Sequence, residues 1–204
     1  MTPVSGDIGA VVLAGGLARR MGGEDKGLIQ LAGKPMVAHV VEAISPAVDS
    51  IVINANRNAE HYAAFGVEVV ADQHAGHPGP LAGLAAGISA LDTSLVFMCP
   101  CDSPFVSSSL VHRLIDGLGK ADVAAAHDGQ RLQPVFALVR RDCAASLARF
   151  LASGERKIDR WFETEQFVSV DASAEVQAFR NINTPEELAA AEKDIAARQD
   201  RSLA

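Results

Sequence analysis

The stretch VVLAGGLARRMGGEDKGLIQLAGKP, residues 11–35, decides how the rest of the chain is interpreted. An apolar run ends abruptly at Gly15 and Gly16, and two arginines and two lysines then alternate with further glycines before apolar periodicity resumes. Glycine lets the backbone adopt unusual dihedrals and approach a ligand closely. A linker would not need so many cations, and a hairpin turn would be shorter. The stretch therefore predicts a loop that brings its N–H groups and its cations up to an anion.

The overall composition is that of one globular, acidic domain. The chain has 204 residues, of which 49% are hydrophobic and 21% charged, and its net charge is −7. An acidic chain is a poor candidate for general nucleic-acid binding, which needs a basic face, so we expect no nucleic-acid partner. No apolar run has the length of a membrane span, and the first residues lack the pattern of a signal peptide. Three cysteines fit a reducing compartment, and together these features predict a cytoplasmic protein with no membrane partner.

Strand-like and helix-like segments alternate along the chain, which predicts an α/β fold with a mostly parallel sheet and helices on both faces. The clearest helix opens with Thr184 as N-cap, Pro185 at its first position and Glu187 as the partner of a capping box. Asn58 is a candidate N-cap for a shorter helix. We expect a flexible tail over about residues 199–204. The expected strands are residues 8–14, 50–56, 67–71, 94–100, 121–127 and 134–139, and the expected helices are residues 35–44, 58–65, 81–91, 107–118 and 184–199.

Polar clusters follow the first four expected strands. They are AGGLARRMGGEDKG (residues 14–27), NANR (54–57), ADQ (71–73) and PCDSP (100–104). In a parallel α/β sheet, ligands collect at the carboxyl ends of the strands. Clusters that are far apart in the sequence should therefore converge on one rim of the sheet and form a single ligand site there.

The glycine-rich loop is neither a P-loop nor a dinucleotide-binding fingerprint, because it lacks both spacings. Residues 13–35 resemble instead the signature of nucleotidyltransferases, and more closely that of the bacterial molybdenum cofactor guanylyltransferases. Other segments resemble the same family in the same order, so that the resemblance covers most of the chain. They are VINANR (52–57), ADQHAGHPGPLAGLAAGI (71–88), FMCPCDSPFV (97–106), AHDGQRLQPVFALV (126–139) and FRNINTPEEL (179–188).

The resemblance implies a fold, a reaction and partners. The fold would be a single-domain, Rossmann-like, three-layer αβα nucleotidyltransferase fold over residues 1–204, with GTP bound by the N-terminal half and molybdopterin by the C-terminal half. The terminal phosphate of molybdopterin would attack the α-phosphorus of GTP, releasing pyrophosphate and giving molybdopterin guanine dinucleotide. The family also implies Mg²⁺ as cofactor, a monomer, and exchange of substrate and product with enzymes of cofactor synthesis and with recipient molybdoenzymes.

The nucleotide-binding positions of the family fall on identifiable residues of this chain. Leu13, Ala14 and Gly15 match its nucleotide-contacting turn, whose backbone would supply the donor and acceptor that guanine requires. Asn54 and Asp72 match positions that bind the nucleoside. The resemblance therefore predicts preference for GTP over CTP and ATP.

The catalytic positions of the family match three further residues. Lys26 matches its polyphosphate-binding lysine, and Arg19 is a candidate for stabilising the transferring phosphoryl group. Asp102 matches the Mg²⁺ ligand of the family, and this position also places it against GTP. A single carboxylate suits Mg²⁺ when phosphates or an Asn complete the coordination of the ion. Asn181 and Asn183 are implied to face the pterin.

Each of these residues also has a purely structural interpretation. Asp102, Asn54 and Asp72 could each close a turn at the end of a strand. Asn183 could only arrange the start of the last helix. Glu24 and Asp25, beside Lys26, could only balance local charge while the site is empty.

Other functions remain open at this point. Within the same enzyme class, a cytidylyltransferase for the same cofactor tends to carry LAAG where this chain has LAGG, and a sugar-phosphate nucleotidyltransferase usually has a longer chain with a sugar-binding insert. Two alternatives belong to other classes: a regulatory module that binds GTP without turnover, and a carrier that binds the cofactor independently of GTP. Pyrophosphate release on mixing with GTP and molybdopterin distinguishes an enzyme from both.

Overall fold

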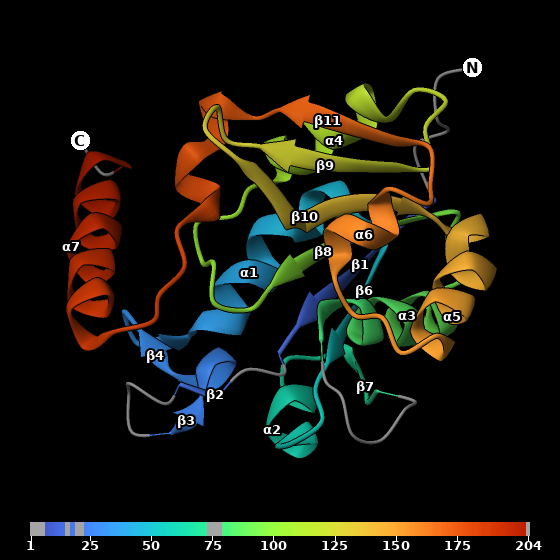
Figure 1. Cartoon of the computed structure of the whole chain (residues 1–204). Helices are drawn as coiled ribbons and strands as arrows, with labels where there is room; N and C mark the ends of the chain where they lie inside the picture. The colour runs from blue at the N-terminus through green and yellow to red at the C-terminus, as the bar shows by residue number, and fades with distance from the viewer. Residues whose placement is uncertain (1–6, 15–16, 19–22, 73–78, 203–204) are drawn as a thin grey trace.

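The computed structural model describes residues 7–14, 17–18, 23–72 and 79–202, and of residues 17–18 and 198–202 it describes the backbone alone. At its centre lies a seven-stranded sheet in the order β11-β9-β10-β8-β1-β6-β7 (Figure 1). β10 is antiparallel to β8 and β9, and the other neighbours are parallel, so the expected mostly parallel sheet is confirmed. The strands are β1 (Ile8–Leu13), β6 (Ser50–Asn54), β7 (Glu68–Val70), β8 (Leu95–Pro100), β9 (Val123–His127), β10 (Leu132–Arg140) and β11 (Phe167–Asp171).

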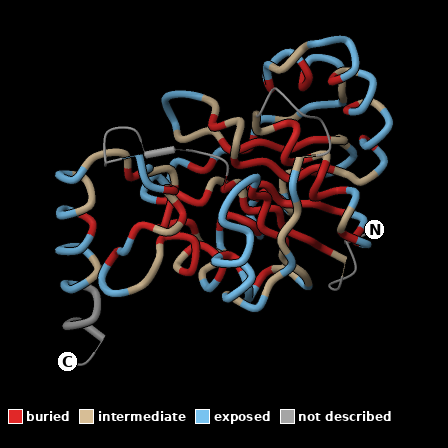
Figure 2. Tube along the Cα trace, turned by 90° about the horizontal axis from the view of Figure 1, so that it is seen from below, coloured by how far each residue is buried: buried red, intermediate tan, exposed pale blue. Residues whose placement is uncertain are grey.

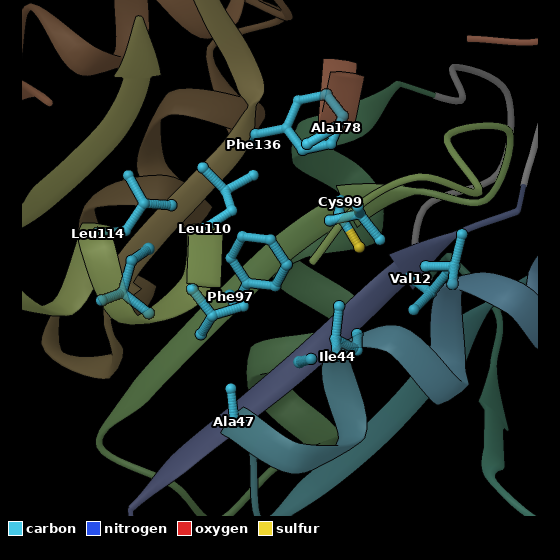
Figure 3. Close-up of a cluster of buried hydrophobic side chains, with 14 of the residues drawn as sticks. Val12, Ile44, Ala47, Phe97, Cys99, Leu110, Leu114, Phe136 and Ala178 are labelled. Atoms are coloured by element: carbon cyan, nitrogen blue, oxygen red, sulfur yellow. The ribbon is translucent and has the colours of Figure 1, made fainter. Parts of the chain in front are cut away.

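Helices cover both faces of this sheet, and alternate side chains of β1 show why. Val12 packs in the core that contains residues of α1 and α4, whereas Val11 packs in the core that contains residues of α3, α5 and α6. Figure 3 shows Val12 and Phe97 of the sheet against Ile44 and Leu110 of the covering helices. This is the predicted three-layer αβα arrangement. The helices are α1 (Met36–Ile44), α2 (Ala59–Ala63), α3 (Pro80–Ala90), α4 (Ser108–Leu118), α5 (Ala144–Ala152), α6 (Ile158–Phe162) and α7 (Pro185–Ser202).

The register of the central strands brings their polar ends together. Leu13, the last residue of β1, pairs with Asn54 at the end of β6 and with Pro100 at the end of β8. The three strands therefore end at the same level, with the NANR and PCDSP clusters on either side of β1. This confirms the expected convergence on one rim.

The long loop after β1 contains more structure than the sequence predicts. Two short antiparallel pairs form within it, β2 (Leu17–Ala18) with β3 (Glu24–Asp25) and β4 (Gln30–Leu31) with β5 (Lys34–Pro35). A turn of 3₁₀ helix, η2 (Lys26–Leu28), lies between the two pairs. Lys26 is thus attached to ordered backbone on both sides. Other 3₁₀ segments among the described residues are η3 (Ser45–Ala47), η4 (Arg141–Cys143) and η5 (Ser173–Phe179).

Side-chain capping explains where α7 begins. The backbone N–H of Glu187 donates to Thr184 Oγ1 at 3.2 Å, and the N–H of Thr184 donates back to a carboxylate oxygen of Glu187 at 3.1 Å, which confirms the predicted capping box. The helix that it opens runs to Ser202, past the expected end at Gln199. Asn58 stands at the N-cap position of α2, but its side chain makes no capping hydrogen bond.

Helix α7 lies at one side of the molecule, next to the β4–β5 pair (Figure 1). A small separate core joins them, in which Leu31 and Met36 pack with Ile182 and Ala191. Figure 2 shows the exposed outer face of α7, in contrast to the buried strands. No helix in the described part of the chain combines the length and apolarity that crossing a membrane requires.

Candidate active site

Five of the residues implicated by the sequence line one cavity at the carboxyl edge of the sheet. Its volume is about 290 Å³, and the ends of β1, β6 and β8 form its floor. Most of these residues are separated by tens of positions along the chain, so the fold brings them together into one site. The five residues are Leu13, Lys26, Asn54, Asp72 and Asp102.

One end of the cavity is built around the ammonium group of Lys26. Its Nζ donates to Asp102 Oδ2 at 2.8 Å and also to Asn183 Oδ1. The side chains of Lys26 and Asp102 are only 19% and 11% exposed, so this ion pair is largely shielded from water. Residues from the loop after β8, from the glycine-rich loop and from the segment before α7 therefore meet at the ammonium group of Lys26.

Backbone and side-chain bonds fix the segment that carries both asparagines. The N–H of Ile182 donates to the carbonyl oxygen of Asp102 at 2.9 Å. The hydroxyl of the fully buried Ser103 donates to Asn181 Oδ1 at 2.6 Å. Asn181 and Asn183 thus adjoin the Asp102 loop, although neither lines the cavity described above.

The other end of the cavity is a network of amides around a carboxylate. Asn54 Nδ2 donates to Asp72 Oδ1 at 2.9 Å, and Asn56 Nδ2 donates to Asp72 Oδ2 at 2.8 Å. The N–H of Asp72 donates in turn to Asn56 Oδ1 at 2.8 Å. These bonds orient the carboxylate without neutralising its charge, so its remaining lone pairs can accept hydrogen bonds from a ligand.

Close packing holds the floor of the site in place. A Cβ on Gly83 of α3 would lie 2.6 Å from Leu13 Cδ2, so only glycine lets the helix approach this closely. Ala14 is buried, its N–H donates to the carbonyl of Asn54, and the Leu13 carbonyl accepts from Cys101. Ala14 therefore supports the cavity without lining it. The predicted residues Gly15 and Arg19, like Gly16 and Arg20, lie outside the described residues.

Sequence reasoning did not assign a role to several residues that line the cavity. Asn56 belongs to the NANR cluster, two residues beyond Asn54, and that spacing could have identified it. Val135 comes from β10, which runs antiparallel to β8. This topology brings Val135 to the cavity, and no local sequence pattern predicts it. The remaining four are Gly79, Pro80, Pro100 and Cys101.

The chemistry of the cavity is that of oxygen acceptors, amides and one ammonium group. Burial raises the pKa of the Cys101 thiol well above its ordinary value, so Cys101 offers no thiolate nucleophile. Within the described ranges, no three His, Cys, Asp or Glu side chains gather as a metal site. Asp102 and Asn183 nevertheless place two oxygens around a cation position, and oxygen is the donor that Mg²⁺ prefers.

Comparison with known proteins identifies the family. Residues 10–170 match the MobA-like NTP transferase domain. A molybdenum cofactor guanylyltransferase of Shewanella piezotolerans is 46% identical over 182 residues, which cover 88% of this chain and 89% of the relative. The protein of the same name from Shewanella halifaxensis is 45% identical over 186 residues, which cover 90% and 93% of the two chains.

Solved structures agree with this assignment. The molybdopterin-guanine dinucleotide biosynthesis protein A of Archaeoglobus fulgidus superposes with a TM-score of 0.79 at 27% identity, over 93% of this chain and 99% of that one. A nucleotidyl transferase of Methanothermobacter, at 21% identity and a TM-score of 0.75, covers 94% of this chain and 99% of its own and shares the fold. With the family domain spanning most of the chain and these relatives matching it nearly end to end, the chain belongs to the molybdenum cofactor guanylyltransferases of the MobA-like NTP transferase family.

Proposed function

We propose that this enzyme transfers GMP from GTP to the terminal phosphate of molybdopterin. A phosphate oxygen of the acceptor forms a bond to the α-phosphorus, the bond from the α-phosphorus to the bridging oxygen breaks, and pyrophosphate leaves with that electron pair. The observation that carries the proposal is that one cavity is lined both by Asp72, a carboxylate held by amides, and by the largely shielded ion pair of Lys26 and Asp102. The names of the relatives supply the guanine and the pterin.

The nucleoside is proposed to lie at the Asp72 end, against the carboxyl end of β1. Guanine presents N1–H and an exocyclic amine, and ribose presents hydroxyls, so an anionic acceptor suits either part of the nucleoside. Asn54 and Asn56 hold both Asp72 oxygens in place before the ligand arrives. Leu13, Ala14 and Gly15 would bring the backbone of the turn to the base.

The triphosphate is proposed to lie at the Lys26 end. Both reactants are anions, so charge neutralisation and alignment carry most of the catalysis. Asp102, with an oxygen of the substrate phosphates or of Asn183, would hold Mg²⁺, which when bound supplies positive charge to the α-phosphoryl group. Lys26 would then donate to phosphate oxygens, and Arg19 is the further candidate for the transferring group.

The acceptor is proposed to approach from the C-terminal half of the chain. Asn181 and Asn183 lie on the segment joined to the Asp102 loop, which would place a bound pterin phosphate beside the same reaction centre. The same proposal describes a cytoplasmic monomer that takes its acceptor from enzymes of cofactor synthesis and delivers the product to molybdoenzymes.

The test is a nucleotide panel with pyrophosphate release as the readout. Initial rates are measured with GTP, CTP and ATP at equal concentration, with Mg²⁺ and molybdopterin present or omitted. We expect rapid release with GTP alone among the three and strict dependence on the acceptor. Comparable rates with CTP would contradict guanylyl transfer and leave the broader nucleotidyltransferase assignment, whereas GTP binding without any release would indicate a regulatory module.

A further inference from the structure

Asp25, which directly precedes Lys26, is bound to a different part of the molecule from its neighbour. It is only 7% exposed. The hydroxyl of Tyr62 in α2 donates to Asp25 Oδ1, and Asn58 Nδ2 donates to Asp25 Oδ2 at 3.2 Å. The sequence suggested that Asp25 balances the charge of Lys26, but the lysine pairs with Asp102 instead.

The side chains of Asn58 and Tyr62 donate hydrogen bonds to Asp25 rather than to groups of their own helix. Asn58 has a φ of 53°, in the left-handed region that few residues other than glycine adopt, and its side chain leaves the end of α2 uncapped. Tyr62 is fully buried, and burial raises the pKa of its phenol, so the hydroxyl keeps the proton that it donates. Asn58, at the N-cap position, instead binds Asp25, which lies 33 positions earlier in the sequence. This long-range bond ties α2 to the loop that carries Lys26.

The chain on the other side of Lys26 is fitted to the same tyrosine. A Cβ on Gly27 would lie 2.5 Å from the hydroxyl oxygen of Tyr62 and 3.0 Å from Cε1. Any side chain at this position would push the backbone away from the ring. Tyr62 therefore contacts the residues immediately before and immediately after Lys26.

We infer that Asp25, Asn58 and Tyr62 are positioning residues that hold the backbone on both sides of Lys26, so that its ammonium group reaches Asp102 and Asn183. Lysine has a long and flexible side chain, and fixing the chain at its root reduces the conformations that it must give up when it meets a phosphate. As far as catalysis is concerned, the inference rests on the proposed function. The alternative is that these contacts between α2 and the loop contribute to stability alone.

Turnover in a double-mutant cycle separates these two roles. Tyr62→Phe removes one hydroxyl and keeps the ring, and we expect it to lower kcat/KM for GTP about tenfold or more, because a small displacement of a catalytic group is costly. In a Lys26→Ala background the same substitution should have little further effect, since the group that it positions is gone. If the fold-decrease in kcat/KM of the double variant equalled the product of the two single decreases, the inference would be overturned. Wild-type turnover of Tyr62→Phe would also overturn it.

The matched control removes a buried hydroxyl at the other end of a strand. Thr93 is 9% exposed and its hydroxyl donates to the carbonyl of Leu95 at 3.0 Å, where β8 begins rather than where it ends at the site. Thr93→Val should lower the unfolding midpoint, as we also expect of Tyr62→Phe, but should leave kcat/KM unchanged. Equal losses of turnover in both variants would show that stability alone is being measured.

A second readout needs no enzyme activity. Trace acylation followed by mass spectrometry measures the reactivity of the Lys26 amine relative to that of the exposed Lys120. We expect Tyr62→Phe and Asn58→Gly to raise this ratio severalfold, and glycine is chosen because it keeps the left-handed backbone while removing the donor. An unchanged ratio in both folded variants would overturn the inference, even with an active wild type. A raised ratio together with an inactive wild type would contradict the proposed function and leave the positioning intact.

Discussion

Asp72 and Asp102 line one cavity and follow β7 and β8, two strands that β1 and β6 separate in the sheet, but their partners differ in kind. Asn54 and Asn56 hold Asp72 through neutral amides, which fix its orientation and leave its charge for a ligand. Asp102 is paired with the ammonium group of Lys26, whose charge a metal ion can replace. From this difference we propose that Asp72 serves recognition of the nucleotide and that Asp102 serves the transfer step.

Asp102→Asn gives the largest expected effect. It changes charge with almost no change in volume, so the fold should persist while the rate of Mg²⁺-dependent pyrophosphate release falls by about 10²-fold or more. Asp92→Asn is the control, since Asp92 is exposed and joins only a surface pair with Arg141. Near wild-type turnover of Asp102→Asn in Mg²⁺ would remove this residue from the transfer step.

Lys26→Ala comes next. Loss of a charged donor to the triphosphate should weaken GTP binding or transfer by about 10- to 100-fold. Lys34→Ala is the matched control from the same stretch, because Lys34 pairs with Glu42 on the surface and such pairs contribute little. We also expect Arg20→Ala to have the smaller effect, and added salt to weaken GTP affinity in the wild type. Similar, small effects of all three substitutions would contradict the assignment of Lys26 to the polyphosphate.

Asp72→Asn should act on binding more than on rate. One anionic acceptor is lost, so KM for GTP should rise about tenfold, while kcat changes little. Steady-state kinetics on the same preparation as Asp102→Asn gives the comparison directly. If kcat fell in Asp72→Asn as steeply as in Asp102→Asn, the two carboxylates would not have separate roles.

A third carboxylate at the same edge of the sheet gives the smallest expected effect. Asp128 accepts from the N–H groups of Arg131 and Gln130 and from the side chain of Gln133, and these bonds lower its pKa from 3.8 to about 2. A carboxylate with a lowered pKa stabilises the fold above its ordinary pKa, and this contribution is lost as the pH falls from about 4 to about 2.

The measurement is the melting temperature of the wild type and of Asp128→Asn between pH 5 and pH 2. The wild type should melt higher at pH 5, and the difference should shrink towards pH 2 while turnover at neutral pH stays unchanged. A difference that is constant with pH would mean that the charge of Asp128 does not contribute. Unlike the two carboxylates of the cavity, Asp128 is held by its own hairpin.

Local patterns were enough to predict most elements of the fold, although they did not predict α5, α6 or β11. The buried runs at β1 and β8 and the capping box of α7 each depend on residues close in sequence. The order of clusters after the strands also predicted that Asp72 and Asp102 would share a site. Such information is contained in periodicity and in short spacings.

The remaining features depend on contacts that no local pattern records. The β2–β3 and β4–β5 pairs are two residues per strand, which is too short for periodicity. The side chain of Asn58 does not cap α2 as expected, because it donates instead to Asp25, a buried acceptor that lies far away in the sequence. Val135 reaches the cavity only because β10 returns antiparallel to β8.

The most direct test of guanylyl transfer follows the phosphorus atoms of GTP. The enzyme is supplied with molybdopterin, Mg²⁺ and GTP labelled at either the α- or the γ-phosphorus, and the products are separated. We expect the α label to appear in the pterin dinucleotide and the γ label in pyrophosphate, and we expect neither label to move without the acceptor. Transfer of the γ label to the pterin, or release of labelled phosphate from GTP independently of the acceptor, would contradict guanylyl transfer.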